Sequence, residues 1–451
     1  MVDFFWNLAS FVVALGILVT VHEYGHFWVA RKNKVKVIRF SIGFGPALWR
    51  KTDKLGTEFV IALIPLGGYV KMLDDRVDDV CQQDRNVTFN AKSVYQRIAI
   101  IAAGPMANFA FAIFAFYLMF LIGVPSLKPV IGNVELNSIA SEANLPSNVE
   151  IVEVAGISTS NWQDVNLALV GKIGDDSIEI KTKSSDSQYI STTILDTKIW
   201  PFSPESSSAL TSLGIAPFLP KVHSEIVNVE KNSPADKAGL KVGDKLIAIN
   251  DKKINDSWKL FSAEIKLFPN TEVTVTIERD GRVEQVKVTP KGIKRNNQLV
   301  GYLGLGPKFD PWPAGHQITL AYGPVDAIGQ SINRTWNLVV LSFDMIGKLI
   351  TGDLSVKNLS GPIAIAQGAG SSAGYGFVYF LGFLALISIN LGIINLLPLP
   401  VLDGGHLLYY LIELVSGKPV PEKIQEVGFK FGALALLGLM SIALFNDFSR
   451  L

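Results

Sequence analysis

Four long apolar stretches dominate the pattern of hydrophobic and polar positions along the chain. They run from Phe4 to about Ala30, from about Ile98 to Val124, from Phe377 to about Leu402, and from Val427 to Phe445. A helix needs about 20 mostly apolar residues to cross roughly 30 Å of bilayer hydrocarbon. The pattern therefore predicts a polytopic α-helical membrane protein with four transmembrane helices.

The composition agrees with a membrane protein and excludes several other classes. Hydrophobic residues make up 49% and charged residues 18% of the 451 positions, whereas charged residues reach about 25% in soluble proteins. The net charge of +1 gives no reason to expect a nucleic-acid partner. A single cysteine, Cys81, excludes an internal disulfide framework and a multi-cysteine metal cluster.

The basic residues predict how the chain is oriented in the membrane. Lysine and arginine are concentrated between residues 31 and 97, in the loop that joins the first two stretches. Loops rich in these residues face the cytoplasm, so both termini and the long segment from Pro125 to Tyr375 are expected outside. The first stretch has only Asp3 before it, and its basic residues follow it, which is not the order of a cleaved signal peptide.

The outer segment contains a repeated pattern. NSPADKAGLKVGDKLIAIN (Asn232 to Asn250) resembles the signature of a PDZ domain, and NSIASEANLPSNVEIVEVA (Asn137 to Ala155) aligns with it 95 positions earlier. The first copy is degenerate, since three of its residues replace glycine or aspartate of the second: Asn144 for Gly239, Asn148 for Gly243 and Val149 for Asp244. Repeats indicate duplicated folding units. We expect two β-rich PDZ domains.

What these two domains do is left open by the sequence. Each copy has a later apolar glycine turn, Leu213 to Ile215 and Leu303 to Leu305. In PDZ folds such a turn can capture the C-terminal carboxylate of a peptide that adds a strand to the sheet. Equally, the domains can be spacers or steric filters that bind no peptide.

These features divide the chain into five parts. Residues from about Ala314 to Leu354 form a partly amphipathic stretch that is expected on the outer membrane surface. The expected parts are 1–124 with the first two helices and the cytoplasmic loop, 126–220 and 221–310 with the two PDZ domains, 311–375 at the membrane surface, and 376–451 with the last two helices.

A metal-binding pattern lies near the end of the first apolar stretch. His22-Glu23-Tyr24-Gly25-His26 is an HExxH sequence. Two histidines four residues apart lie on one face of a helix and can hold one ion, while Glu23 is placed to take a proton from a water molecule. Polar residues snorkelling at a helix end are the alternative. However, ionisable residues on a membrane helix are costly and usually functional.

A catalytic zinc site usually has three protein ligands, so a third is needed. Residues Phe27 to Lys32 contain no histidine. Asp403, in the LDGG sequence at the end of the third stretch, is the best candidate because both sites approach the inner boundary of the membrane. His406 is the rival ligand. Pro398 and Pro400 are expected to break the third helix just before Asp403.

Two further groups of residues are candidates for substrate contact. Phe59 to Val70 and Ser41 to Pro46 are typical of strands and turns, which either dip back into the membrane or form a simple cytoplasmic hairpin. Asn390 and Asn395 on the third helix either bond an unwound substrate backbone or tie helices together.

Taken together, the HEYGH sequence, a Gly-Pro-x-x-Asn element (Gly104, Pro105, Asn108) and NxxPxPxLDGG (Asn395 to Gly405) resemble the site-2 protease family of intramembrane zinc metalloproteases. The paired outer domains resemble its bacterial tandem-PDZ type. The resemblance covers essentially the whole chain.

The resemblance implies Zn²⁺ on His22, His26 and Asp403, with Glu23 as catalytic acid and base. It further implies a re-entrant β element that clamps extended substrate, with contacts from Gly67, Gly68, Tyr69, Asn390 and Asn395. The expected location is the bacterial inner membrane, with the active site near the cytoplasmic side.

The expected activity is regulated intramembrane proteolysis of single-span proteins in a stress response. By resemblance, the substrates are an anti-sigma factor already trimmed outside and remnant signal peptides, and the PDZ pair excludes substrates with bulky outer domains. A non-catalytic scaffold that recruits partners through its PDZ domains is the alternative. A metal transporter is weaker, because the second and fourth stretches lack acidic or histidine ligands.

Overall fold

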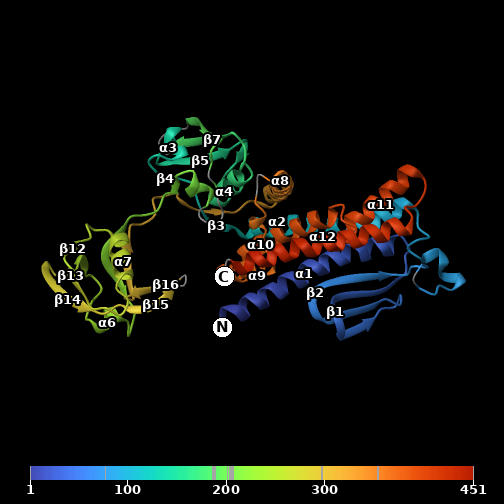
Figure 1. The fold of residues 1–451 in the computed structure, drawn as a ribbon, viewed down its shortest axis with the longest axis horizontal. Coiled ribbons are helices and arrows are strands. Elements are labelled where there is room, and N and C mark those ends of the chain that lie inside the picture. The colour runs from blue at the N-terminus through green and yellow to red at the C-terminus, as the bar shows by residue number, and fades with distance from the viewer. Residues whose placement is uncertain are drawn as a thin grey trace.

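A computed structural model describes residues 2–76, 78–184, 189–200, 202, 208–295, 298–352 and 355–449. Each of the four apolar stretches forms a helix long and apolar enough to cross a membrane. These helices are α1 (Val2–Lys32), α2 (Val94–Ile122), α10 (Phe377–Leu396) and α12 (Glu422–Ser449). They lie side by side in one bundle, away from two β-rich units (Figure 1).

The third helix ends earlier than the sequence suggested. α10 stops at Leu396, and Leu397 already has an extended backbone. The expected break at Pro398 and Pro400 is therefore confirmed, but the expectation that the span reaches Leu402 is wrong. Asp403 begins a separate helix, α11 (Asp403–Ser416). The chain turns sharply between the two helices, since proline cannot donate the backbone hydrogen bonds that would continue α10.

Helix α2 forms the centre of the bundle because it packs against both α1 and α10. Its alanines and phenylalanines, together with apolar residues of α10, make the bundle core. The contact with α1 is very close at Gly25, where a Cβ atom would collide with the Ala103 carbonyl and lie 2.8 Å from Cβ of Ala107. Only glycine allows this approach of the two backbones.

The segment expected at the membrane surface contains two helices. α8 (Pro324–Thr351) buries Ala327, Ser331, Thr335 and Leu338, and it packs against α2 and α10. α9 (Pro362–Tyr375) packs against α1. The carboxylate of Asp447 in α12 accepts hydrogen bonds from three backbone amides at the start of α9 (Gly361, Ile363 and Ala364). Both helices therefore pack against the bundle, and the place of this segment at the membrane surface stays a prediction.

Strands β1 (Val37–Thr52) and β2 (Glu58–Met72) follow α1 and bend so that each supplies two segments to one antiparallel sheet. The register places 68–72 at one edge, then 37–42, then 58–62, then 47–52. The bend in β1 lies at Gly43 and Gly45, whose φ angles of +92° and +87° suit glycine alone. One face of the sheet packs Phe40 against Phe27 of α1.

Two β-rich units lie between α2 and α8. The first contains β4 (Ile131–Val134), α3 (Ile139–Glu142), β5 (Val149–Val154), β6 (Ile157–Ser158), α4 (Trp162–Val170), β7 (Ser177–Ser184), β8 (Ile190–Asp196), α5 (Ala209–Ser212) and β9 (Ile215–Pro217). The second contains β10 (Val222–Val229), α6 (Pro234–Lys237), β11 (Lys245–Ile249), β12 (Lys252–Lys253), α7 (Trp258–Lys266), β13 (Val273–Arg279), β14 (Arg282–Val288), β15 (Lys291–Arg295), β16 (Gln298–Tyr302) and β17 (Leu305–Phe309). Each unit has its own apolar core.

The repeated sequence pattern has a matching backbone in the two units. Ser138 caps α3 and Ser233 caps α6 through the same side-chain bond. Asn144 and Asn148 have φ of +55° and +58°, as Gly239 and Gly243 have +81° and +94°. Asparagine is one of the few residues that tolerate this left-handed region. Asparagine thus preserves the turns of the degenerate copy.

The first unit is attached to the bundle more firmly than the second. Strands β3 (Val124–Leu127) and β18 (Gln317–Leu320) pair and close the base of the whole insertion. Arg334 of α8 forms an ion pair with Asp164, and Lys348 forms one with Asp175 at 3.2 Å. The second unit extends away from α8 and the bundle (Figure 1).

Candidate metal centre

Three side chains converge where α1, α2 and α11 meet. His22 and His26 lie one turn apart on α1, and their exposed fractions are only 9% and 6%. Their Nε2 atoms lie 3.2 Å apart. Oδ2 of Asp403, the first residue of α11, lies 3.2 Å from Nε2 of His22 and 3.3 Å from Nε2 of His26.

The size of this triangle tests whether a metal ion fits. Edges of 3.2, 3.2 and 3.3 Å match a tetrahedron whose centre lies about 2.0 Å from each corner, which is the usual zinc bond length to nitrogen and carboxylate oxygen. Two imidazole nitrogens and one carboxylate oxygen are also a ligand set typical of catalytic zinc. Among the described residues, this is the group of histidine and acidic side chains whose ligand atoms lie close enough to hold one ion.

The carboxylate of Asp403 gives a second test of whether a cation fits here. Its Oδ2 atom is buried and accepts no hydrogen bond from the described part of the chain. A buried, unsatisfied polar atom is costly in a folded protein. An ion held between Oδ2 and the two imidazoles would remove that cost, so the residues present fit a zinc ion.

The turn that delivers Asp403 depends on the two glycines after it. A Cβ at Gly404 would collide with the carbonyl oxygens of Leu396 and Leu397, and one at Gly405 with the carbonyl oxygen of Leu399 and with Pro400. The start of α11 therefore lies directly on the end of α10. This close packing explains why Asp403-Gly404-Gly405 follows the two prolines.

Helix α2 supports the imidazoles from the other side. Nδ1 of His26 donates to the carbonyl of Ile100 at 2.9 Å, and Nδ1 of His22 lies 3.1 Å from the Asn108 amide. Gly104 lies between these contacts, and a Cβ there would collide with the ring of His26 and lie 2.8 Å from Cε1 of His22. The sequence motif contained Gly104 and Asn108 but did not reveal these contacts.

Glu23 lies between the metal-binding group and the sheet. Its carboxylate approaches the backbone of Val70 and is close enough to His22, His26 and Asp403 to interact with their charges. A Cβ at Gly68 would lie 3.1 Å from Cγ of Glu23 and 2.8 Å from Val19. The absence of a side chain at Gly68 thus lets the edge segment 68–72 lie against α1 beside Glu23.

The rival ligand His406 is not part of the converging group. It lines a separate cavity of about 170 Å³, together with Arg76, Arg97, Tyr410 and Glu413. His406 lies one turn after Asp403 on α11, but its side chain lines this cavity and is not one of the three converging ligands. Asp403, and not His406, therefore lies where the two imidazoles meet.

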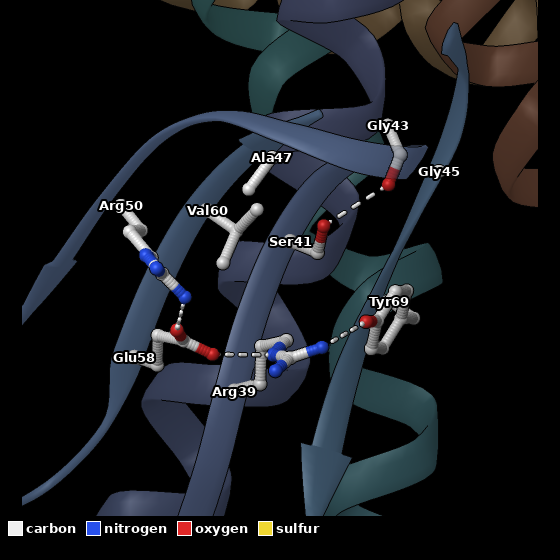
Figure 2. Close-up of a pocket in the computed structure, with 9 residues that line it drawn as sticks. All are labelled: Arg39, Ser41, Gly43, Gly45, Ala47, Arg50, Glu58, Val60 and Tyr69. Atoms are coloured by element: carbon white, nitrogen blue, oxygen red, sulfur yellow. Dashed lines mark hydrogen bonds and ion pairs between the residues drawn. The ribbon is translucent and has the colours of Figure 1, made fainter. Parts of the chain in front are cut away.

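Tyr69 follows Gly68 in the chain, but its side chain lines a separate pocket. Its hydroxyl accepts a hydrogen bond from Arg39 at 3.2 Å, and its ring stacks on Phe44. Figure 2 shows Tyr69 and Arg39 pointing toward one another in a pocket of about 120 Å³ that also contains Glu58 and Arg50. Gly67, with φ of +144°, lies under the Phe44 ring.

The two predicted asparagines of α10 are not part of the converging group either. Oδ1 of Asn390 accepts a hydrogen bond from Ser342 of α8 at 3.3 Å. Asn395 is half-buried near the end of α10 and has no side-chain hydrogen bond within the described ranges. The Asn390 contact is what the helix-tying alternative predicts, and substrate contact by either residue remains a prediction.

Comparison with known proteins agrees with the geometry. The family model described as peptidase family M50 matches residues 10–439. The chain is 51% identical over 451 residues to the regulator of sigma-E protease RseP of Escherichia coli (strain K12), and 50% identical over 453 residues to the protease RseP of Yersinia pestis. It is 46% identical over 453 residues to a putative zinc metalloprotease of Vibrio cholerae. Each of these alignments covers 100% of both chains.

Proposed function

The chain belongs to peptidase family M50 and is a zinc metalloprotease, and we propose that it hydrolyses peptide bonds within the transmembrane segments of single-span proteins. The observation that carries the proposal is the convergence of His22, His26 and Asp403 at the end of a membrane-length helix. A hydrolytic site on such a helix is reached by peptide bonds that enter the membrane. A scaffold that only recruits partners has no use for this site.

In the proposed site His22, His26 and Asp403 hold one zinc ion, and Glu23 is the catalytic acid and base. A zinc ion held there would polarise the scissile carbonyl and lower the pKa of its bound water to about 7. Glu23 accepts a proton from the attacking water and later gives it to the leaving amine. Its position beside His22 and against segment 68–72 supports this role, since substrate and water must both reach it.

The sheet offers a way to hold an unwound substrate. Peptide groups of a transmembrane helix are bonded to each other, so the helix must unwind before cleavage, and its freed groups need new partners. Segment 68–72 is an edge of the sheet and lies beside Glu23. We propose that extended substrate pairs with this edge, as peptides do in strand addition.

The side chains of the sheet support its insertion into the membrane from the cytoplasm. Its tip exposes large apolar residues, which would be unfavourable in water: Phe44, Leu48, Ile61, Leu63 and Ile64. Its base carries Arg39, Glu58 and Arg50 in an ion-pair cluster. An apolar tip and a charged base are what a re-entrant hairpin at the cytoplasmic boundary requires.

The two outer units are proposed to be PDZ domains that filter substrates by size. Their element orders match from β4 to β8 and from β10 to β14, and together with the shared caps and left-handed turns this supports a duplicated fold. The ion pairs from the first unit to Arg334 and Lys348 hold it over α8, where it would obstruct a substrate with a bulky outer domain. A bound peptide ligand remains compatible with either unit.

The relatives' names include the regulator of sigma-E protease, so we place this activity in the sigma-E pathway of the bacterial inner membrane. The termini and the PDZ units then face the periplasm, and the zinc site lies near the cytoplasmic side. The proposed substrates are an anti-sigma factor after a first outer cut and remnant signal peptides.

Replacement of the proposed acid and base tests the catalytic assignment. Purified Glu23→Gln protein should keep one zinc ion per chain but lose cleavage of a model transmembrane peptide. Glu426→Gln is the control, because Glu426 is an acidic residue exposed on α12. This variant should cleave like the wild type. Full activity in Glu23→Gln would contradict the assignment of Glu23, and wild-type protein without zinc would contradict the site.

Removal of the outer units tests the size filter separately. Leu127 pairs with Gln317 in the β3–β18 ladder, so residues 128–316 can be replaced by a short Asn-Gly turn that keeps the ladder. We expect this variant to cleave substrates that still carry their outer domains. If such precursors stay uncut while trimmed substrate is cleaved, the filter is wrong and the protease assignment stands.

A further inference from the structure

The Asn108 side chain has an unexplained arrangement in the interior of the bundle. Asn108 is fully buried on α2, and its Nδ2 atom lies 3.1 Å from Nδ1 of His22. Its Oδ1 atom is buried and has no hydrogen-bond partner in the described chain. One end of this amide therefore meets the imidazole, and the other end is unsatisfied.

The chemistry of imidazole shows which end of the amide belongs at His22. A neutral histidine carries a proton on one ring nitrogen and a lone pair on the other. For Nε2 of His22 to bind a cation it must offer its lone pair, so Nδ1 must carry the proton and donate it. An NH₂ group facing Nδ1 would impose the opposite tautomer and point a proton from Nε2 at the ion.

A half-turn of the Asn108 amide resolves this conflict. The oxygen and nitrogen exchange places in nearly the same shape, and hydrogen bonding decides which arrangement is adopted. Oδ1 then lies about 3 Å from Nδ1 of His22 and accepts its proton, which is an ordinary N–H···O distance. The partnerless oxygen also gains a donor.

We propose that Asn108 is a positioning residue, whose amide oxygen accepts the Nδ1 proton of His22 and thereby holds Nε2 ready to bind the zinc ion. The proposal rests on the proposed metal site. It assigns no contact between Asn108 and substrate or ion.

The arrangement at His26 supports the need for such an acceptor. Nδ1 of His26 donates to the backbone carbonyl of Ile100 at 2.9 Å, and a carbonyl can only accept. The tautomer of His26 is therefore fixed by the main chain. His22 lies one turn earlier and has the Asn108 side chain at its Nδ1 atom, so the same task falls to an amide.

The backbone of Asn108 is also held in place from the opposite side. Oγ of Ser388 on α10 donates to the Asn108 carbonyl at 2.8 Å, and Ser388 is fully buried. The main chain of Asn108 is thus held by α10 while its side chain faces α1. A fixed acceptor orients a ligand more effectively than a mobile one, because less ordering is needed when the ion binds.

The test compares side chains of similar size that differ in their ability to accept a proton. Asn108→Leu removes the acceptor, Asn108→Asp keeps it, and Asn108→Ala removes it without a branched side chain. Asn446→Leu is the matched control, since Asn446 is another buried asparagine but bonds Val356 and Leu359 far along the chain from the metal ligands. Zinc affinity of the full-length protein in detergent is measured by competition with a chromophoric chelator, and the Co²⁺ absorption spectrum reports ligand geometry.

The expected outcome separates orientation from packing. Loss of a group that orients a metal ligand typically weakens binding by about 10- to 100-fold, so Asn108→Leu and Asn108→Ala should show this loss and an altered Co²⁺ spectrum. Asn108→Asp and Asn446→Leu should stay within about 3-fold of the wild type. Thermal unfolding of each variant identifies any that fail to fold. If Asn108→Leu does not fold, Asn108→Ala replaces it in the comparison.

Two results would overturn the proposal. Wild-type affinity in Asn108→Leu or Asn108→Ala would show that no acceptor is needed. Equal weakening in Asn108→Asp and Asn108→Leu would assign the effect to packing. Wild-type protein that bound no zinc at all would instead remove the metal site itself and, with it, the reason for an acceptor.

Discussion

Gly104→Ala tests the placement of the imidazoles against α2. The new Cβ would lie 2.6 Å from Cε1 of His26 and 2.8 Å from Cε1 of His22. Carbon atoms in ordinary contact are separated by about 3.5 Å or more. Both rings would therefore have to retreat by roughly 0.7 to 0.9 Å.

This displacement is larger than a zinc site can absorb. Bond lengths in such sites vary by only about 0.2 Å. Helix α2 cannot move away from α1 easily, because it is also packed against α10. We expect zinc affinity to fall by at least about 100-fold, since a shift of two ligands should exceed the 10- to 100-fold effect of an outer-shell change.

The assay is chelator competition on purified protein, with cleavage of a transmembrane peptide measured at saturating zinc. Gly16→Ala is the matched control, because Gly16 also lies on a helix of the bundle, α1, and a Cβ there meets nothing within 4 Å. It should bind zinc and cleave as the wild type does. If Gly104→Ala retained wild-type affinity, the imidazoles would not lie where the structure has them.

Further predictions concern the scaffold around the site. Hydrogen bonds from His223 to Asp310 and to Asp256 raise the pKa of His223 above 6.5. The protonated imidazole therefore stabilises the second unit below about pH 6.5. This stabilisation is lost as the pH rises through the raised pKa of the folded state. Protection of the β10 backbone amides from hydrogen exchange should thus be greater in wild type than in His223→Gln at about pH 6, and this difference should shrink as the pH rises through the raised pKa of His223. An equal difference at low and at high pH would contradict this. Asp447→Ala removes the acceptor of three backbone amides at the start of α9 and should lower the free energy of unfolding by about 1–3 kcal/mol, measured by thermal or denaturant unfolding. The control Glu426→Ala changes an exposed residue and should alter this free energy by less than about 0.5 kcal/mol; equal effects of the two substitutions would show that the α9 cap is unimportant.

Local sequence rules were sufficient where the relevant neighbours are close in the chain. The spacing of His22 and His26 on one helix follows from α-helical geometry, and Pro398 and Pro400 end α10 because of their own covalent structure. The repeat was recognisable despite substitution, since asparagine and glycine share a tolerance for positive φ. These features needed no knowledge of the tertiary structure.

Other features depend on neighbours that are distant in sequence. Asn108 meets His22 across 86 positions, and the partner of His26 is a main-chain carbonyl that any residue would supply. The start of α11 at Asp403 was missed because the apolar pattern continues through the two prolines to Leu402. The bend of β1 into two sheet segments depends on pairing with both halves of β2, which periodicity alone cannot specify.

The central claim is that two imidazoles of α1 and the carboxylate of Asp403 surround one zinc ion. X-ray absorption at the zinc edge of the purified, full-length protein tests it most directly. The account predicts one zinc per chain with two imidazole ligands and oxygen at about 2.0 Å, and no sulfur at about 2.3 Å. A third imidazole shell, a sulfur ligand from Cys81, or an unchanged spectrum in Asp403→Ala would contradict it.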